Sequence, residues 1–162
     1  MDRHFGGAVP PSGEPTQLER DVDAGVQEAL SRYCSSLRGL EYRQAIGELH
    51  HLWSLGNQYL DARAPWALVH TDRDAAGGVL HRAINLAYLF AVVASPVIPF
   101  AAQSTVAALG MDWRGAGPSW DEAADLNALQ PGHPIHVPEL LFRRITQSDI
   151  DTWTERFQGS IG

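Results

Sequence analysis

Apolar residues recur at helical spacing through most of this sequence, and no segment keeps the two-residue alternation of a half-buried strand. One such stretch follows a capping box at 16–19 and ends at Gly39, and a second runs from Leu40 to Ala64. The most apolar stretch, 74–94, ends before Ser95–Pro96 and suits the buried central helix of a bundle. This periodicity predicts an all-α fold, a helical bundle of about five helices.

Shorter elements complete the predicted bundle. A short piece follows Pro65, and a helix over 100–109 stops at Gly110. Ser148–Asp149 can cap a short C-terminal helix. Residues 111–138 are rich in glycine, proline and aspartate, which indicates a long ordered crossover between the last two helices.

The composition excludes several classes of protein. The formal net charge is −7 and all 12 cationic side chains are arginine, so a general nucleic-acid binder is disfavoured. Arginine stacks on bases and pairs with phosphates through two donors, so a small local RNA site remains compatible with this charge. The apolar run 86–94 is half the length that a bilayer requires. Cys34 is the single cysteine and cannot form an intrachain disulfide, which suits a reducing cytoplasm.

No catalytic or metal-binding constellation can be assembled from the sequence. His133 and His136 are separated by a proline, which disrupts the helix that usually presents such metal ligands. Glu48, His50 and His51 lack the H-E-x-x-H order of a zinc protease, and there is no G-x-S-x-G nucleophile motif. We therefore predict no catalytic residue and no metal ligand.

The pair Pro65–Trp66 marks a sharp corner between two helical stretches. Proline suits the first position of a helix and pushes the preceding residue out of the helical region, so the direction of the chain at Trp66 is fixed. The indole either fills the core at this corner or is exposed for binding. We expect Tyr59 to pack and to offer its hydroxyl to a neighbour, and Asp61 to cap the short helix near Pro65.

The stretch 57–66, with the pattern Asn-x-Tyr-x-Asp-x-x-x-Pro-Trp and an apolar helix after it, resembles the anticodon-binding domain of methionyl-tRNA synthetase. The likeness continues, in order, through Arg3-His4-Phe5-Gly6-Gly7, Val79-Leu80-His81-Arg82-Ala83, Ser95-Pro96-Val97-Ile98-Pro99, Ala107-Ala108-Leu109-Gly110, Gly132-His133-Pro134-Ile135 and Pro138-Glu139-Leu140-Leu141-Phe142-Arg143-Arg144-Ile145. It therefore covers nearly the whole chain.

The resemblance implies an RNA-binding role for four residues. The tryptophan after the proline contributes to recognition of the CAU anticodon in that family, which assigns this role to Trp66. Arg63 is the second candidate, with an ordinary surface arginine as the alternative. Asn57 matches the family and could contact RNA, with a hydrogen bond between helices as the alternative. Arg3 lies where the family's first anticodon-domain helix ends.

We accordingly expect one helical anticodon-binding domain over 1–162. Residues 1–14 would be a linker and the remnant of a preceding helix, and 146–162 the C-terminal helix and tail. The implied function is tRNA anticodon recognition for methionyl-tRNA synthetase in the cytoplasm. The implied partners are methionine tRNA and the catalytic domain of the synthetase, with no membrane and no DNA. The alternative is a non-catalytic helical scaffold, descended from that domain, that binds protein.

The sequence also predicts that this chain does not activate methionine. The family's Lys-Met-Ser-Lys-Ser loop and its His-Ile-Gly-His motif are absent, so ATP and methionine would bind to a separate catalytic domain and this chain needs no cofactor. Pyrophosphate exchange with methionine and ATP should not exceed a no-protein control. Turnover above that control would overturn the non-catalytic interpretation.

Overall fold

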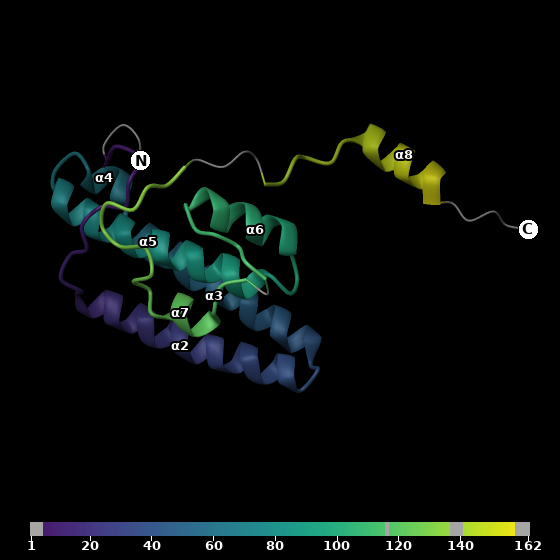
Figure 1. The fold of residues 1–162 in the computed structure, drawn as a ribbon, viewed down its shortest axis with the longest axis horizontal. Helices are drawn as coiled ribbons and strands as arrows, with labels where there is room; N and C mark the ends of the chain where they lie inside the picture. The colour runs from purple at the N-terminus through teal and green to yellow at the C-terminus, as the bar shows by residue number, and fades with distance from the viewer. Residues whose placement is uncertain (1–4, 116, 137–140, 158–162) are drawn as a thin grey trace, which may run out of the picture.

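The structure, a computed structural model, describes residues 5–115, 117–136 and 141–157, and these form helices joined by ordered loops (Figure 1). The elements in chain order are α2 (Gln17–Arg38), α3 (Tyr42–Arg63), α4 (Pro65–Leu68), α5 (Arg73–Ala94), α6 (Pro99–Ala108), α7 (Trp120–Ala124) and α8 (Gln147–Phe157). The five longer helices agree with the prediction of an all-α bundle. The one-turn helix α7 was not predicted and lies inside the crossover.

Helices α2 and α3 form a long antiparallel pair (Figure 1). The capping box is confirmed, because Thr16 is the N-cap of α2 and exchanges hydrogen bonds with Glu19. The predicted end at Gly39 is confirmed, since α2 ends at Arg38 with Gly39 as its C-cap, and the chain then reverses at Leu40, which has a φ of 58°. A left-handed residue just past a helix is the usual way to close its last carbonyls.

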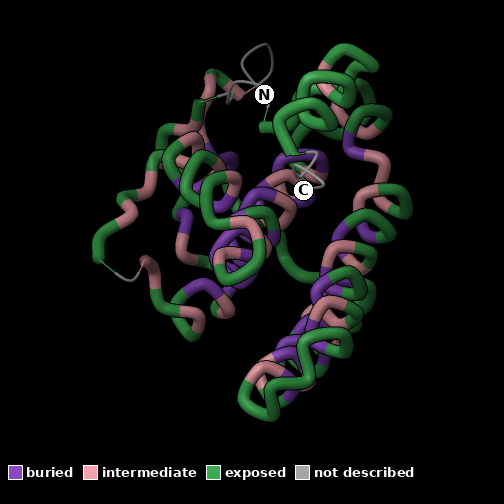
Figure 2. Tube along the Cα trace, turned by 90° about the vertical axis from the view of Figure 1, so that its right-hand side faces the viewer, coloured by how far each residue is buried: buried purple, intermediate pink, exposed green. Residues whose placement is uncertain are grey.

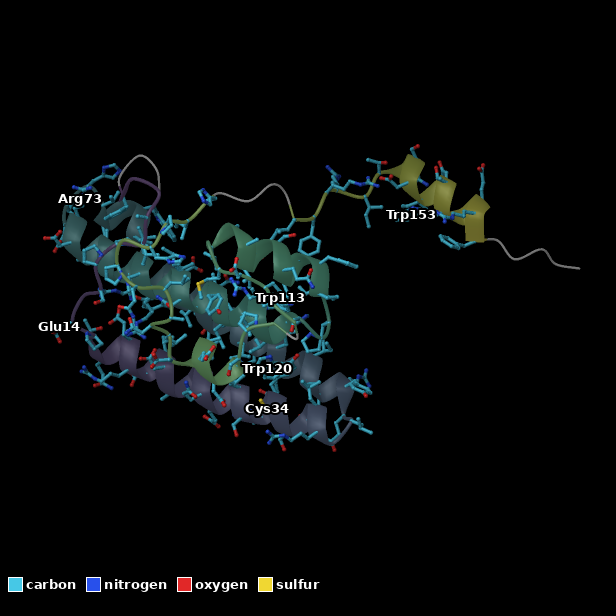
Figure 3. The ribbon with its side chains drawn as sticks, viewed as in Figure 1. Glu14, Cys34, Arg73, Trp113, Trp120 and Trp153 are labelled. Carbon is cyan, nitrogen blue, oxygen red and sulfur yellow. The ribbon has the colours of Figure 1, made fainter. Side chains whose placement is uncertain are left out.

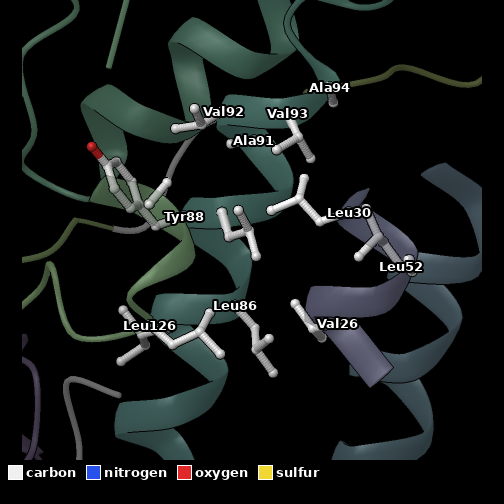
Figure 4. Packing of buried hydrophobic residues seen from close by; sticks show 14 of the residues in the cluster. Val26, Leu30, Leu52, Leu86, Tyr88, Ala91, Val92, Val93, Ala94 and Leu126 are labelled. Atoms are coloured by element: carbon white, nitrogen blue, oxygen red, sulfur yellow. The ribbon is translucent and has the colours of Figure 1, made fainter. Parts of the chain in front are cut away.

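Helix α5 is the centre of the molecule, as predicted, and contacts α3, α4, α6 and α7. Asp72 caps its first turn by accepting a hydrogen bond from the backbone N–H of Ala75 at 2.9 Å. Its buried side chains, with those of α2 and α3, form the core seen in Figure 4, and Figure 2 shows this buried interior between exposed outer faces. Gly56 of α3 permits this packing, because a Cβ there would lie 2.5 Å from Cε2 of Phe90.

By length and composition alone α5 could cross a membrane, with a mean hydropathy of 1.4 over its most apolar window. The prediction considered only the uninterrupted run 86–94, whereas the mean over an 18-residue window of α5 stays apolar despite the polar residues within it. In this fold 67% of that window is buried, as in the core helix of a bundle.

The crossover is ordered through specific contacts with α5. Asn85 is fully buried; its Oδ1 accepts the backbone N–H of Leu129 at 2.9 Å, and its Nδ2 donates to the carbonyl of Leu129 at 3.2 Å. Near the N-terminus, Ala8 and Pro134 form an isolated antiparallel bridge, and Val9 is buried beside it. The segments before α2 and after α7 therefore lie side by side across the bundle.

Helix α8 stands apart from the bundle, and none of its residues is buried (Figure 1). The prediction of its cap is confirmed for Asp149 and wrong for Ser148. Asp149 accepts hydrogen bonds from the backbone N–H of Thr146 at 2.9 Å and from its hydroxyl at 2.7 Å, so the cap begins at Thr146 and not at Ser148. A bidentate pair with Arg143, at 2.6 and 2.8 Å, reinforces this turn.

The core assignment is testable at Leu89, which is fully buried. Replacing Leu89 with Ala removes buried apolar surface and leaves a cavity, so the free energy of unfolding should fall by roughly 2–5 kcal/mol. The matched control is Phe100→Ala, since that ring is 84% exposed on α6 and should cost less than about 0.5 kcal/mol. Urea melts of both variants would contradict this fold if the two losses were equal.

Candidate functional site

The corner between α3 and α4 is built on Ala64. This residue ends α3 and begins α4, with φ 40° and ψ 59° in the left-handed region, which is uncommon for a residue with a Cβ. Its N–H donates to the carbonyl of Leu60 at 2.8 Å, and its carbonyl accepts the N–H of Ala67 at 2.9 Å. Pro65 is buried at the first position of α4, as predicted. The corner therefore has one defined backbone path.

Trp66 is 60% exposed on the outside of this corner. The alternative that its indole fills the core is wrong. Pro65 takes the buried position, and α4 is a single turn that cannot bury two adjacent large side chains on the same face. An aromatic face of this kind is open to stacking by a planar partner.

The other residues predicted to lie at or near the site differ in how far the structure agrees with their expected roles. Asn57 is exposed on α3, and none of the hydrogen bonds between described residues involves its side chain, so the helix-to-helix hydrogen bond was wrong. Asp61 does not cap α4, which has Ala64 at its N-cap and no side-chain cap. Arg3 lies outside the described residues. Arg63 is partly buried, and its environment differs from that of a surface arginine.

Arg63 and Tyr59 both reach the carboxylate of Glu19 on α2. The hydroxyl of Tyr59 donates to Oε1 of Glu19 at 3.0 Å, which confirms that Tyr59 packs and finds a partner. The other carboxylate oxygen accepts the backbone N–H of Thr16 at 3.0 Å and also the Thr16 hydroxyl. Nε of Arg63 lies 3.2 Å from Oε1. The last turn of α3 is thus tied to the first turn of α2.

The Arg63–Glu19 pair is held by charge more than by a directed hydrogen bond. Nε of Arg63 is enclosed and has no hydrogen-bond partner in the part of the chain that the structure describes, although it lies 3.2 Å from the carboxylate. The Arg63 side chain as a whole is 27% exposed, against 7% for Glu19. Arg63 therefore sits between the buried carboxylate and the surface.

Burial opposes ionisation of Glu19, but its hydrogen bonds from Thr16 and Tyr59 and the nearby charge of Arg63 outweigh this effect. Together they hold the pKa of the Glu19 carboxyl below its ordinary value of 4.5. For Tyr59, burial and the adjacent carboxylate raise the pKa of the hydroxyl, so it stays a donor at neutral pH. The cluster is therefore an ionised carboxylate with neutral and cationic donors around it.

A cavity of about 1130 Å³ opens beside this cluster, between the segment 11–15, α2 and the start of α5. Figure 3 places Glu14 and Arg73, which both line it, at the end of the bundle away from α8. Its acidic side chains outnumber its arginines; they are Glu14, Glu19, Asp23, Asp72, Asp74, Asp121 and Asp125. The cavity is therefore a poor site for a phosphate group.

Other candidate residues have structural roles. The ring of His133 is 2.8 Å from the carbonyl of Leu109 through Nε2, and no group of three or more metal-ligating side chains comes together in 5–115, 117–136 and 141–157. Burial raises the pKa of the Cys34 thiol, which leaves it a poor nucleophile at neutral pH. The ring of His50 stacks on Trp53 with centroids 5.3 Å apart.

The described helices thus form a bundle that presents the exposed Trp66 at the corner between α3 and α4. The family described as the anticodon binding domain of methionyl tRNA ligase matches residues 9–161. The chain belongs to this family.

Individual relatives agree with this assignment. A methionine–tRNA ligase of Caulobacter vibrioides (strain NA1000 / CB15N) is 42% identical over 156 residues, which are 96% of this chain and 27% of that protein. One from Streptomyces avermitilis is 34% identical over 98% of this chain and 28% of its own length. The chain thus spans little more than a quarter of these relatives.

The fold has a counterpart among solved structures. The apo form of Mycobacterium tuberculosis methionyl-tRNA synthetase superimposes with a TM-score of 0.74, over 89% of this chain and 29% of that chain. The sequence identity in this comparison is 18%, so it supports the arrangement of the helices alone.

Sequence reasoning missed Glu19 as a member of the site. The capping box identified Glu19 as a helix-start residue, and a cap satisfies a carboxylate locally. What it does not predict is that Glu19 is 5% exposed and meets the end of α3. The pair Tyr59 and Arg63, four residues apart on one helical face, was the available signal that a buried acceptor lies opposite.

The depressed pKa of Glu19 predicts an acid-sensitive contribution to stability. A carboxyl with a lowered folded-state pKa stabilises the fold at pH values above its ordinary pKa, and this contribution is lost as the pH falls through the folded value. The unmodified chain should therefore exceed Glu19→Gln in unfolding free energy by a constant, maximal amount above about pH 5, and this difference should shrink as the pH falls below that value. Urea melts across pH 3 to 7 measure this, and a difference independent of pH would contradict it.

Proposed function

We propose that this chain recognises the CAU anticodon of methionine tRNA for methionyl-tRNA synthetase, with Trp66 as the principal contact. The observation that carries the proposal is the 60% exposed indole of Trp66 on a rigid corner in a member of this family. An unpaired base of the anticodon loop offers a planar face, and stacking on a fixed tryptophan holds that base out of the loop at little cost in ordering. Arg63 and Asn57 supply polar contacts near the corner.

The charge of the chain supports recognition by a few contacts. A net charge of −7 and the acidic cavity beside the corner disfavour broad binding to phosphates. Stacking on an indole requires no positive charge on the protein. Arg63, three residues before Trp66 in the chain, keeps part of its side chain exposed, which suits a single phosphate or base edge.

The remaining steps of aminoacylation belong to the rest of the enzyme. The curated relatives are nearly four times as long as the matched segment, and they are methionine–tRNA ligases. In this proposal ATP and methionine bind to the catalytic domain, while this domain selects the tRNA and places its acceptor end. The site of action is the cytoplasm, where translation takes place, and neither DNA nor a membrane is a partner.

A protein-binding scaffold is the second candidate, and one observation favours it. Helix α8 exposes Ile150, Trp153 and Phe157 along one side, with Phe157 72% exposed. An apolar stripe of this kind suits a protein partner. The scaffold hypothesis does not account for Trp66, because Trp66 is on α4 and the apolar stripe is on α8. A protein-binding scaffold has no need of an exposed indole at the α3–α4 corner.

The proposal predicts separate effects of Trp66→Ala on binding and on stability. Affinity for a CAU stem-loop should fall by roughly 1–3 kcal/mol, the usual loss of one base–aromatic stack. The melting transition should move little, because the ring contributes mainly exposed surface. Binding is measured by fluorescence anisotropy of a labelled stem-loop at low salt, where phosphate contacts are strongest.

Two controls make this result specific. A stem-loop with a changed anticodon reports non-specific association, and Trp153→Ala removes another exposed tryptophan, 41% exposed, from α8. The changed loop should bind more weakly than the CAU loop, and Trp153→Ala should leave both affinities unchanged. Equal affinity of the unmodified chain for the two loops would favour the scaffold.

A further inference from the structure

Glu19 is more deeply buried than a helix cap requires. A capping-box glutamate needs only its own helix, and most such residues lie in water at the first turn. Here the carboxylate is 5% exposed and receives donors from two helices: Thr16 on its own side and the hydroxyl of Tyr59 across the interface, at 3.0 Å. Burying an ionised carboxylate is costly unless its oxygens are all satisfied, so the arrangement has a structural purpose beyond the cap.

That purpose is visible in the position of its partners. Tyr59 and Arg63 are on the last turn of α3, and the next residue is Ala64, whose left-handed angles turn the chain into α4. Both side chains converge on Oε1 of Glu19, at 3.0 Å and 3.2 Å. Fixing two points on this turn fixes the direction in which Pro65 and Trp66 leave it.

Glu19 also selects one position for Arg63. Asp72 and Glu14 line the same cavity as Arg63 and are exposed carboxylates that could attract its guanidinium. The carboxylate of Glu19 holds Nε in the enclosed part of the cavity wall, while 27% of the side chain remains exposed. Without this anchor, Arg63 would be distributed among several acidic neighbours.

We propose that Glu19 is a positioning residue for anticodon recognition: through Tyr59 and Arg63 it holds the α3–α4 corner in the orientation that presents Trp66 and Arg63 to the anticodon loop. This inference rests on the proposed function. It assigns to a buried carboxylate on α2, outside the Pro–Trp motif, control over how selectively that motif reads RNA.

The test uses the full 162-residue chain and compares Glu19→Gln with Asp23→Asn. Asp23 lies one turn further along α2 and pairs with Arg82 of α5, so this control breaks an ion pair beside the same cavity and removes none of the hydrogen bonds of Glu19. Affinities for a CAU stem-loop and a changed-anticodon stem-loop are measured at a temperature where circular dichroism shows each variant folded. Partial unfolding lowers both affinities equally, whereas loss of positioning lowers their ratio.

The expected result is a roughly tenfold loss of CAU affinity in Glu19→Gln, comparable to one hydrogen bond to a charged group, with little change for the other loop. Asp23→Asn should keep the ratio of the unmodified chain. When Glu19→Gln is introduced into the Arg63→Gln variant, the ratio of the CAU affinity to the changed-loop affinity should fall by less than it does when Glu19→Gln is introduced into the unmodified chain. The reason is that part of the effect of Glu19 passes through Arg63, which is already absent. Tyr59→Phe, which removes one tie without changing charge, should show a smaller loss and replaces Glu19→Gln if that variant does not fold.

The outcomes separate the two proposals. If the unmodified chain binds both loops equally, the proposed function fails and this inference fails with it. If the unmodified chain discriminates and Glu19→Gln discriminates equally well, the proposed function stands and the positioning role is overturned. The positioning role through Arg63 is also overturned if the losses of selectivity from Glu19→Gln and Arg63→Gln are fully additive in the double variant. If Tyr59→Phe has to replace Glu19→Gln, full selectivity in Tyr59→Phe overturns the positioning role.

Discussion

The burial of α5 is the constraint on which the rest of the structure depends. A 22-residue helix that is apolar on most sides cannot remain in water, so other elements must cover each of its faces. Helices α3, α4, α6 and α7 do so, and α2 packs on α3 and also contacts α5 directly through the Tyr33 hydroxyl and the Asp23–Arg82 pair. The exposed corner is a consequence of this arrangement, because α4 is a single turn that covers the start of α5 with Pro65 and leaves Trp66 on the outside.

Buried polar groups give this apolar bundle a unique arrangement. Helices packed by apolar contacts alone can slide or rotate, whereas a buried donor or acceptor is satisfied in one register only. Asn85 holds the crossover at Leu129, and the hydroxyl of Tyr33 on α2 donates to the carbonyl of Val93 on α5 at 2.9 Å. The ring of Tyr33 also stacks on Trp120 of α7, with centroids 5.5 Å apart. Glu19 has the same role at the end where α3 turns into α4.

The sequence was sufficient for whatever depended on local periodicity and on chain-breaking residues. Helical spacing predicted the long helices, and Pro65 predicted the corner, because proline geometry is fixed by covalent structure. Contacts across long sequence separations were not predictable in this way. Helix α7 owes its one turn to packing against α5, and Glu19 carries a local signal, the capping box, that is complete without its partners on α3. The exposure of Trp66 could not be predicted for the same reason. The general preference of tryptophan for buried positions does not tell which side chains pack around this particular residue.

The electrostatics of the chain restrict how the proposed recognition can work. A basic RNA-binding surface gains affinity from every phosphate nearby, whatever the base sequence, and its binding weakens steeply with salt. In the proposed recognition, the carboxylates around the cavity that Arg63 lines would repel an RNA backbone placed there, so an RNA loop would gain little affinity unless a base stacked on Trp66. The partly buried Arg63 at the end of α3 is already paired with Glu19, which reduces its attraction for phosphates in general. An acidic surround of this kind would suppress sequence-independent binding to phosphates, so a larger share of the remaining affinity would depend on the base that stacks. Under the proposed function, tight binding of a whole tRNA would come from contacts outside this domain, and this domain would supply the selectivity.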